Sequence, residues 1–347
     1  MRHASRLVFS AVLLTWPGLA AAGDAEPANP AASPRARAVL RYLQGLEGRS
    51  DRKIVSGQFT NFGPSATATD CERAFKQTGR WPAMIGLDYA DFGTGGLAYE
   101  RVNKVAIDYA RKGGLVTISA HLYSPARSGG HGLRDKDVDL KSLLEPGTET
   151  HGRWMKELDI LAAGLGQLQD AGVVVQWRPF HEMNGDWFWW GGKDPGTFIR
   201  VWQHMFEYFT NTKKLNNLLW VYSPNHGRRT AAYYAGDRYV DVVGLDAYTD
   251  LVDPKHILGA AEVAGLPKPF GFTEFGPHGP HNPPGDYDYR RFLEGVQAHF
   301  PRTCFFLSWH DNWGLGRNRY TRELLNHPAI VNREDLPREL AASTTPP

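Results

Sequence analysis

The chain has 347 residues, which is too long for a small module and within the range of one large α/β barrel. Hydrophobic residues make up 42% and charged residues 22%, so the composition excludes disordered and fibrous classes. The 39 Lys and Arg residues nearly balance the 37 Asp and Glu residues, and the net charge is +2. A field this weak does not favour nucleic acid or an anionic membrane as a partner.

Aromatic residues are abundant, at 12% of the chain, and 11 of them are tryptophan. A hydrophobic core can accommodate some of these rings. A sugar-binding cleft also uses them, because flat apolar rings stack on the C–H faces of pyranose units. The composition leaves both uses open.

Residues 1–22 have the pattern of a secretory signal peptide. Arg2 and Arg6 give a basic start, an apolar stretch follows, and Ala20–Ala22 offers the small residues that signal peptidase cleaves. The alternative is an apolar N-terminal helix of the folded domain. We expect an exported protein, periplasmic or extracellular, with one domain at 23–347 and its core at about 36–332.

The two cysteines, Cys71 and Cys304, are far apart in the sequence, which excludes a CxxC metal or redox site. Export would permit a disulfide between them. Two separately buried thiols are equally compatible with the sequence.

Short apolar runs rich in Val, Ile, Leu and Phe recur along the chain, as expected of parallel strands buried on both faces. The eight predicted strands are Ile54–Val55, Ala83–Leu87, Leu115–Ala120, Val173–Trp177, Leu218–Tyr222, Val240–Leu245, Phe270–Thr273 and Cys304–Ser308.

Helical periodicity separates many of these runs. The predicted helices are Arg101–Lys112, Arg153–Asp170, Pro195–Thr210 and Tyr287–His299. This alternation predicts a single-domain (β/α)8 TIM barrel. A doubly wound sheet is the rival, but no GxGxxG or P-loop is present. The connection from His121 to Gly152 is unusually long, and we expect it to shape a cleft at the carboxyl ends of the strands.

Polar and aromatic residues follow the predicted strands at the end where TIM-barrel active sites lie. Glu182 and Glu274, after the fourth and seventh strands, would face one cavity, and two such carboxylates suit glycoside hydrolysis. The alternative is a structural carboxylate bonded to Arg178 or a loop amide. His181-Glu182 begins like the zinc motif HExxH, but Gly185 stands where the second His is required, so no metal is expected.

Residues 177–191, WRPFHEMNGDWFWWG, resemble the acid/base motif of glycoside hydrolase family 26, and 271–276, GFTEFG, resemble its nucleophile segment. The likeness extends from VSGQF at 55–59 through GLDY, SAHL, VYSPN and GLDAY to LSWHDNWG at 307–314. Typical members of this family are endo-β-1,4-mannanases.

The resemblance implies a retaining double displacement with Glu182 as acid/base and Glu274 as nucleophile. It further implies a set of substrate-binding residues: His121, Trp154, His181, Trp187, Asp246, Tyr248 and Trp309. Trp177, Trp202 and Trp220, by contrast, are expected to pack the scaffold.

The expected substrate is β-mannan, cut by a monomer that needs no cofactor. Mixed-linkage β-glucan and β-1,3-xylan are alternative substrates for the same fold and mechanism. A non-catalytic polysaccharide-binding barrel is an alternative of another class. An acyl-transferring hydrolase is disfavoured because no GxSxG nucleophile elbow is present.

Overall fold

The computed structural model describes residues 26–129, 131–279 and 285–342. The predicted signal peptide, 1–22, lies outside the described residues. Within the described part, no helix combines the length and the apolar character that a membrane crossing would require.

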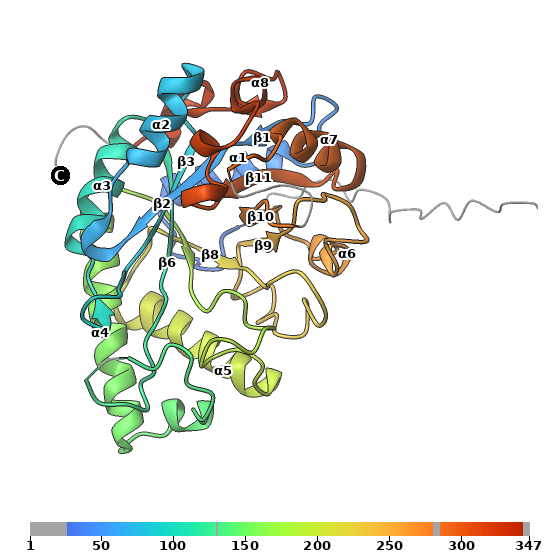
Figure 1. Cartoon of the computed structure of the whole chain (residues 1–347). Helices are drawn as coiled ribbons and strands as arrows, with labels where there is room; N and C mark the ends of the chain where they lie inside the picture. Colours follow the sequence, from blue (N-terminus) through green and yellow to red (C-terminus); the bar gives the residue numbers. More distant parts are fainter. Residues whose placement is uncertain (1–25, 130, 280–284, 343–347) are drawn as a thin grey trace, which may run out of the picture.

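Eight parallel strands form a closed barrel, which confirms the predicted (β/α)8 fold (Figure 1). Each strand pairs with the next along the chain, and the pair Ser308–Gln58 closes the last strand onto the first. The barrel strands are β2 (Gly57–Phe62), β3 (Met84–Asp88), β6 (Leu115–Ser119), β7 (Val175–Arg178), β8 (Leu218–Tyr222), β9 (Val242–Tyr248), β10 (Phe270–Gly276) and β11 (Thr303–Ser308).

The first predicted strand was placed too early. Ile54–Val55 is a two-residue strand, β1, that pairs with β11 and with β12 (Ile330–Val331), whereas the barrel strand β2 begins at Gly57. Polar Gln58 concealed this strand in the sequence, yet its side chain is fully buried. Its amide donates to the carbonyl of Trp309 and accepts from the N–H of Leu315.

The described part has eight α-helices, most of which lie around the outside of the barrel (Figure 1). They are α1 (Pro34–Leu46), α2 (Thr69–Thr78), α3 (Glu100–Arg111), α4 (Glu149–Asp170), α5 (Pro195–Glu207), α6 (Ala260–Ala264), α7 (Tyr289–His299) and α8 (Thr321–Leu325). The sequence places the start of α5 correctly, because the Asp194 carboxylate caps the N–H of Thr197 at 2.8 Å and Pro195 opens the helix.

Helix α1 covers residues from the barrel interior rather than following a strand. Its buried face, which includes Val39, Leu40 and Leu43, belongs to the same apolar cluster as Met84 and Leu219 of the barrel strands. A second and larger apolar cluster contains the outer helices and three fully buried tryptophans, Trp177, Trp202 and Trp220. The expectation that these three tryptophans pack the scaffold is therefore confirmed.

Two of the segments that connect a strand to the next helix are important for the site, because they lie at the carboxyl ends of the strands. A small antiparallel hairpin, β4 (Ala90–Asp91) with β5 (Gly96–Leu97), follows β3. In the described residues of the long connection after β6, 120–129 and 131–148, there is no α-helix or strand, and one 3-10 helix spans Leu140–Leu144. This connection is held against the loop after β7 by the hydrogen bond from Trp189 N–H to the Leu133 carbonyl, 3.0 Å.

Cys71 and Cys304 are both buried and both free, so the two thiols do not form a disulfide.

Candidate active site

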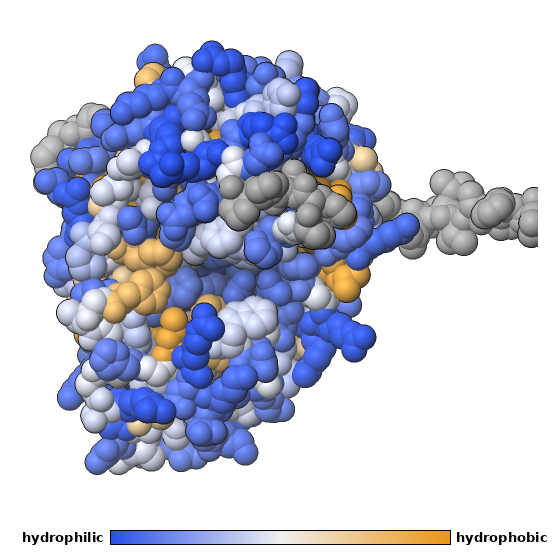
Figure 2. All heavy atoms as spheres, in the orientation of Figure 1, coloured by the Kyte–Doolittle hydropathy of each residue, from blue (hydrophilic) through white to orange (hydrophobic). Residues whose placement is uncertain are grey.

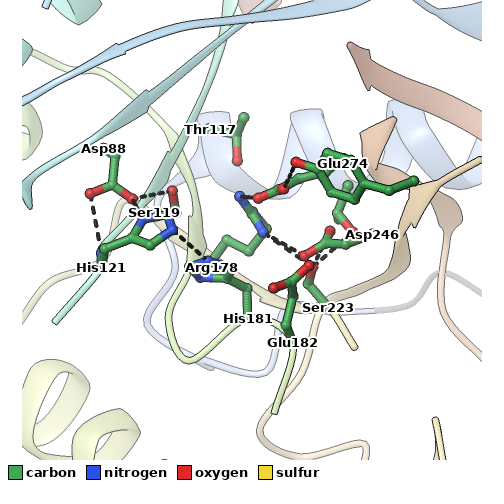
Figure 3. A network of polar contacts seen from close by, with 12 residues as sticks. Asp88, Thr117, Ser119, His121, Arg178, His181, Glu182, Ser223, Asp246 and Glu274 are labelled. Atoms are coloured by element: carbon green, nitrogen blue, oxygen red, sulfur yellow. Dashed lines mark hydrogen bonds and ion pairs between the residues drawn. The ribbon is translucent and has the colours of Figure 1, made fainter. Parts of the chain in front are cut away.

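The carboxyl ends of β7, β9 and β10 bring three acidic side chains together (Figure 3). One oxygen from each of Glu182, Asp246 and Glu274 lies within 4.8 Å of one oxygen from each of the others. Register explains part of this arrangement, because Asp246 of β9 pairs directly with Glu274 of β10. In adjacent strands, residues paired in this way point to the same face of the sheet.

Glu274 lies on β10 and is 3% exposed. Arg178 Nη2 donates to its Oε1 at 2.5 Å, and the Tyr248 hydroxyl donates to its Oε2 at 2.6 Å. A carboxylate anion accepts both of these bonds, and an attacking carboxylate must be an anion. Burial and the charge of Glu274 raise the pKa of Tyr248 well above its usual range, so the phenol keeps its proton.

Gly276 is necessary for the position of Tyr248. A Cβ at Gly276 would lie 2.4 Å from the Tyr248 ring. Glycine therefore lets the ring pass close to the end of β10 and reach Glu274.

Glu182 lies in the turn after β7, and its environment differs from that of Glu274. Burial and the nearby charge of Glu274 raise its pKa to about 7, while the hydrogen bond from Trp187 works in the opposite direction. Trp187 Nε1 donates to Glu182 Oε2 at 2.6 Å. A carboxyl group with a raised pKa can deliver a proton near neutral pH.

The backbone of this turn is unusual. Phe180 has φ of +52° and Glu182 has φ of +56°, a region that non-glycine residues rarely adopt. The N–H of Glu182 donates to the carbonyl of Ser223 on the neighbouring strand end at 2.7 Å. The turn is thus held in a strained conformation at the position that presents the acid.

Arg178 is a central member of the site, although the sequence suggested it only as a partner for a structural carboxylate. It is 1% exposed and bonds Asp246 through Nη1 at 3.1 Å as well as Glu274. Ser223 donates to the other oxygen of Asp246 at 2.7 Å. Burial and the charge of Glu274 raise the pKa of Asp246 well above its usual range. The guanidinium contacts both carboxyl groups and offsets part of this effect, because its positive charge lowers the pKa of Asp246.

A second chain of polar contacts runs from β3 to the turn that carries Glu182 (Figure 3). Asp88 is fully buried and accepts from the Nδ1 of His121 at 2.9 Å, from the His121 N–H at 3.1 Å and from the Ser119 hydroxyl at 2.5 Å. The Nε2 atoms of His121 and His181 lie 3.1 Å apart. The sequence had not identified Asp88, and its place in the motif GLDY was the available signal.

The two histidines link Asp88 to the turn that carries Glu182. The carboxylate of Asp88 accepts a hydrogen bond from His121 Nδ1, and the Nε2 atoms of His121 and His181 share a second hydrogen bond. Burial lowers the pKa of His181 well below its usual range, so this ring is neutral. The Nδ1 atom of His181 is buried without a partner among the described residues.

The predicted aromatic residues divide into two groups. Trp309 follows β11 and stacks on Phe59, with ring centroids 3.9 Å apart. Trp187 is partly exposed beside Glu182. Trp154, in contrast, is completely buried within α4.

The placement of Trp154 among the sugar contacts is not supported by the structure. Its ring packs on Phe180 and Trp189, at 5.9 Å and 6.4 Å between centroids. It therefore supports the strained turn from behind and does not line the cleft.

The comparisons with known proteins agree with this geometry. The family profile described as Glycosyl hydrolase family 26 matches residues 28–335. The chain belongs to glycosyl hydrolase family 26. It is accordingly a glycoside hydrolase, which decides against a non-catalytic barrel.

The chain is also similar to several known mannanases. The chain is 35% identical to mannan endo-1,4-beta-mannosidase A and B of Caldalkalibacillus mannanilyticus, over 95% of this chain and 67% of that protein. It is 34% identical to mannan endo-1,4-beta-mannosidase of Bacillus subtilis, over 89% of both chains. A solved structure of a Bacillus subtilis mannanase aligns with a TM-score of 0.82 at 32% identity, over 89% of this chain and 95% of that one.

Proposed function

We propose that this protein is a secreted, retaining endo-β-1,4-mannanase that hydrolyses internal linkages of mannan, glucomannan or galactomannan. The observation that carries the proposal is the pair Glu182 and Glu274. Their nearest oxygens lie within 4.8 Å, and their surroundings suit an acid and an anion respectively. Retaining enzymes place the two carboxyl groups about 5–5.5 Å apart, whereas inverting enzymes need about 6.5–9.5 Å to admit a water. The relatives' activity supports mannan as the substrate.

In the first step, a Glu274 oxygen attacks the anomeric carbon of the −1 sugar, and the Glu182 carboxyl transfers its proton to the departing glycosidic oxygen. A glycosyl ester on Glu274 results. In the second step, Glu182, now a carboxylate, takes a proton from water. The water oxygen forms a bond to the anomeric carbon and Glu274 leaves, so two inversions give net retention.

The remaining site residues have supporting roles. Tyr248 and Arg178 hold Glu274 by hydrogen bonds to its two oxygens, and Asp246 shares the guanidinium. Trp309 would lie beneath the −1 sugar, and Trp187 beside the leaving group. His121 and His181 would border the −1 sugar. We propose a monomer that uses no cofactor or metal, exported by a signal peptide at residues 1–22.

Two variants test the assignment. Glu274→Ala should abolish turnover of all substrates, because no other group can form the glycosyl ester. Glu182→Ala should lose polysaccharide hydrolysis but still form the glycosyl-enzyme from an aryl mannoside with a good leaving group, which needs no protonation. Equal loss on both substrate types in Glu182→Ala would refute the acid/base role. A first-formed α-anomer from a β-linked substrate, observed by NMR, would refute retention.

Substrate identity is decided by initial rates on mannan, galactomannan, lichenan and xylan measured side by side. Mannan and galactomannan should be hydrolysed fastest. Faster hydrolysis of lichenan or xylan would assign the chain to mixed-linkage glucan or β-1,3-xylan instead.

A further inference from the structure

Phe92 is the most exposed large apolar side chain in the part of the chain that the structure describes, at 52%. It lies in the β4–β5 hairpin, immediately after Asp91. Asp91 stiffens the hairpin: its carboxylate accepts from the N–H of Gly93 at 2.9 Å and from the Thr94 hydroxyl at 2.8 Å. An ordered loop therefore holds an apolar ring toward solvent. Exposure of this ring to water is unfavourable unless a ligand or another surface covers it.

Phe92 borders a cavity of about 480 Å³. This volume falls within the about 300–1,000 Å³ of small-molecule sites. The cavity is lined by Phe92, Tyr123, Arg127, His131, Gly132, Leu133, Arg134 and Asp135. Aromatic rings with a few hydrogen-bonding groups between them match a pyranose, which has apolar C–H faces and a rim of hydroxyls.

The cavity wall is itself organised. Arg127 Nε donates to the Asp135 carboxylate at 2.7 Å, and the Ser124 N–H donates to the His131 carbonyl at 3.1 Å. The His131 N–H in turn donates to the Gly95 carbonyl at 3.3 Å, which joins this wall to the Phe92 hairpin. The two loops therefore form one continuous surface.

This surface continues the catalytic cleft. Ring centroids follow one another from Trp309 to Phe62 at 6.0 Å, from Phe62 to Phe92 at 5.0 Å, and from Phe92 to Tyr123 at 6.4 Å. His121 meets both Phe62 and Phe92 edge-on, at 5.6 Å and 5.9 Å. Figure 2 shows a hollow near the middle of this face with hydrophobic residues gathered along one side of it.

We propose that Phe92, Tyr123 and the cavity beside them form a distal glycone subsite, here termed the Phe92 subsite. It binds a neutral hexopyranose unit of the substrate, with the apolar face of the sugar stacked on Phe92. The proposal rests on the proposed function, which places the −1 sugar at Trp309 and the leaving group beside Trp187. The line of rings leads from Trp309 through Phe62 to Phe92, and we assign this direction to the glycone. A substrate chain extended in that direction covers the exposed ring.

The test compares Phe92→Ala with wild-type enzyme on manno-oligosaccharides of increasing length and on a short aryl β-mannoside with a good leaving group. Phe92→Ala should lower kcat/KM about three- to tenfold on the long oligosaccharides, the size expected for one lost aromatic contact. It should leave kcat/KM on the aryl mannoside unchanged and move the preferred cleavage point along the oligosaccharide. Phe92→Trp should retain the wild-type length dependence.

Phe75→Ala is the matched control. Phe75 is another solvent-facing phenylalanine, 36% exposed, but it stacks on Trp81 and does not line the cavity. This variant should show the wild-type length dependence on every substrate. A loss in Phe75→Ala equal to that in Phe92→Ala would overturn the subsite, because any lost surface ring would then have the same effect.

Three further results would overturn the proposal. These are an equal loss on short and long substrates in Phe92→Ala, a loss confined to substrates extended on the leaving-group side, and a wild-type dimer that Phe92→Ala converts to a monomer. Failure of the proposed function is distinguishable. An enzyme inactive on mannan would be tested with oligosaccharides of the polymer it does cleave, and Phe92→Ala should still lose only the long ones.

Discussion

The indole N–H of Trp187 donates a 2.6 Å hydrogen bond to Oε2 of Glu182, and it is five residues away in the same turn. This bond stabilises the ionised form of Glu182, whereas burial and Glu274 favour the protonated form. The pKa of Glu182 therefore depends on opposing effects, and removal of the Trp187 hydrogen bond alone should change it.

Trp187→Phe should move the alkaline limb of the kcat/KM profile to higher pH. Glu182 must be protonated in the first step, so kcat/KM falls as pH rises through its pKa of about 7. Removing a hydrogen bond that lowers the pKa raises it further, by up to about one unit. The profile on a manno-oligosaccharide measures this shift, and an unmoved or lowered limb would contradict the role of Trp187.

Asp88→Asn should impair the acid/base step specifically. Asp88 orients the ring of His121 by a hydrogen bond to Nδ1, and His121 contacts His181, which directly precedes Glu182. We expect kcat/KM on oligosaccharides to fall about ten- to hundredfold, as for a lost charged hydrogen bond. Aryl mannosides with good leaving groups should lose much less, because they need little protonation.

Asp108→Asn is the control for this variant, since Asp108 is an exposed carboxylate on α3. It should behave as wild type on both substrates. If Asp88→Asn lowers both rates equally and in proportion to a drop in Tm, Asp88 only supports the fold.

Arg178→Met should destabilise the protein strongly near neutral pH. The substitution leaves Asp246 and Glu274 buried without their common cation, which costs about 3–5 kcal/mol of unfolding free energy. Arg178 lowers the pKa of Asp246, so its loss raises that pKa further, and the folded variant binds a proton at Asp246 more readily than the unfolded chain does. The Tm deficit relative to wild type should therefore shrink as pH falls from 7 toward 5.

The control for Arg178→Met is Arg49→Ala, which removes a surface pair with Asp51. This pair is solvent-exposed, so the variant should keep the wild-type Tm throughout the range. A Tm deficit in Arg178→Met that stays constant with pH would mean that lost packing, rather than unpaired charge, causes the destabilisation.

Reductant should leave the Tm unchanged, because Cys71 and Cys304 do not form a disulfide that could restrict the unfolded chain. Burial raises the pKa of the Cys71 thiol to about 12 and that of Cys304 well above its usual range, so both thiols should react slowly in the native state. Thiol titration should give two equivalents only after denaturation. A Tm lowered by reductant would contradict the absence of a disulfide.

The amino-acid sequence was enough to predict the barrel architecture and the end of the barrel at which the site lies. Buried strands read as apolar runs, and a parallel barrel brings the carboxyl ends of its strands to one mouth. Glu182 and Glu274 could therefore be assigned to one site although they lie far apart in the sequence. Among the eight barrel strands, only β2 was missed by the prediction, because buried Gln58 makes its run look polar.

The contacts that each side chain makes could be found only in the folded barrel. Trp154 and Trp187 were both expected to bind substrate. Trp154 is instead buried behind the turn, whereas Trp187 donates a hydrogen bond to Glu182. The roles of Arg178 and Asp88 depend on contacts with β9, β10 and the end of β6. The physical reason is that periodicity fixes the face on which a side chain lies, whereas barrel closure and register fix what lies opposite it.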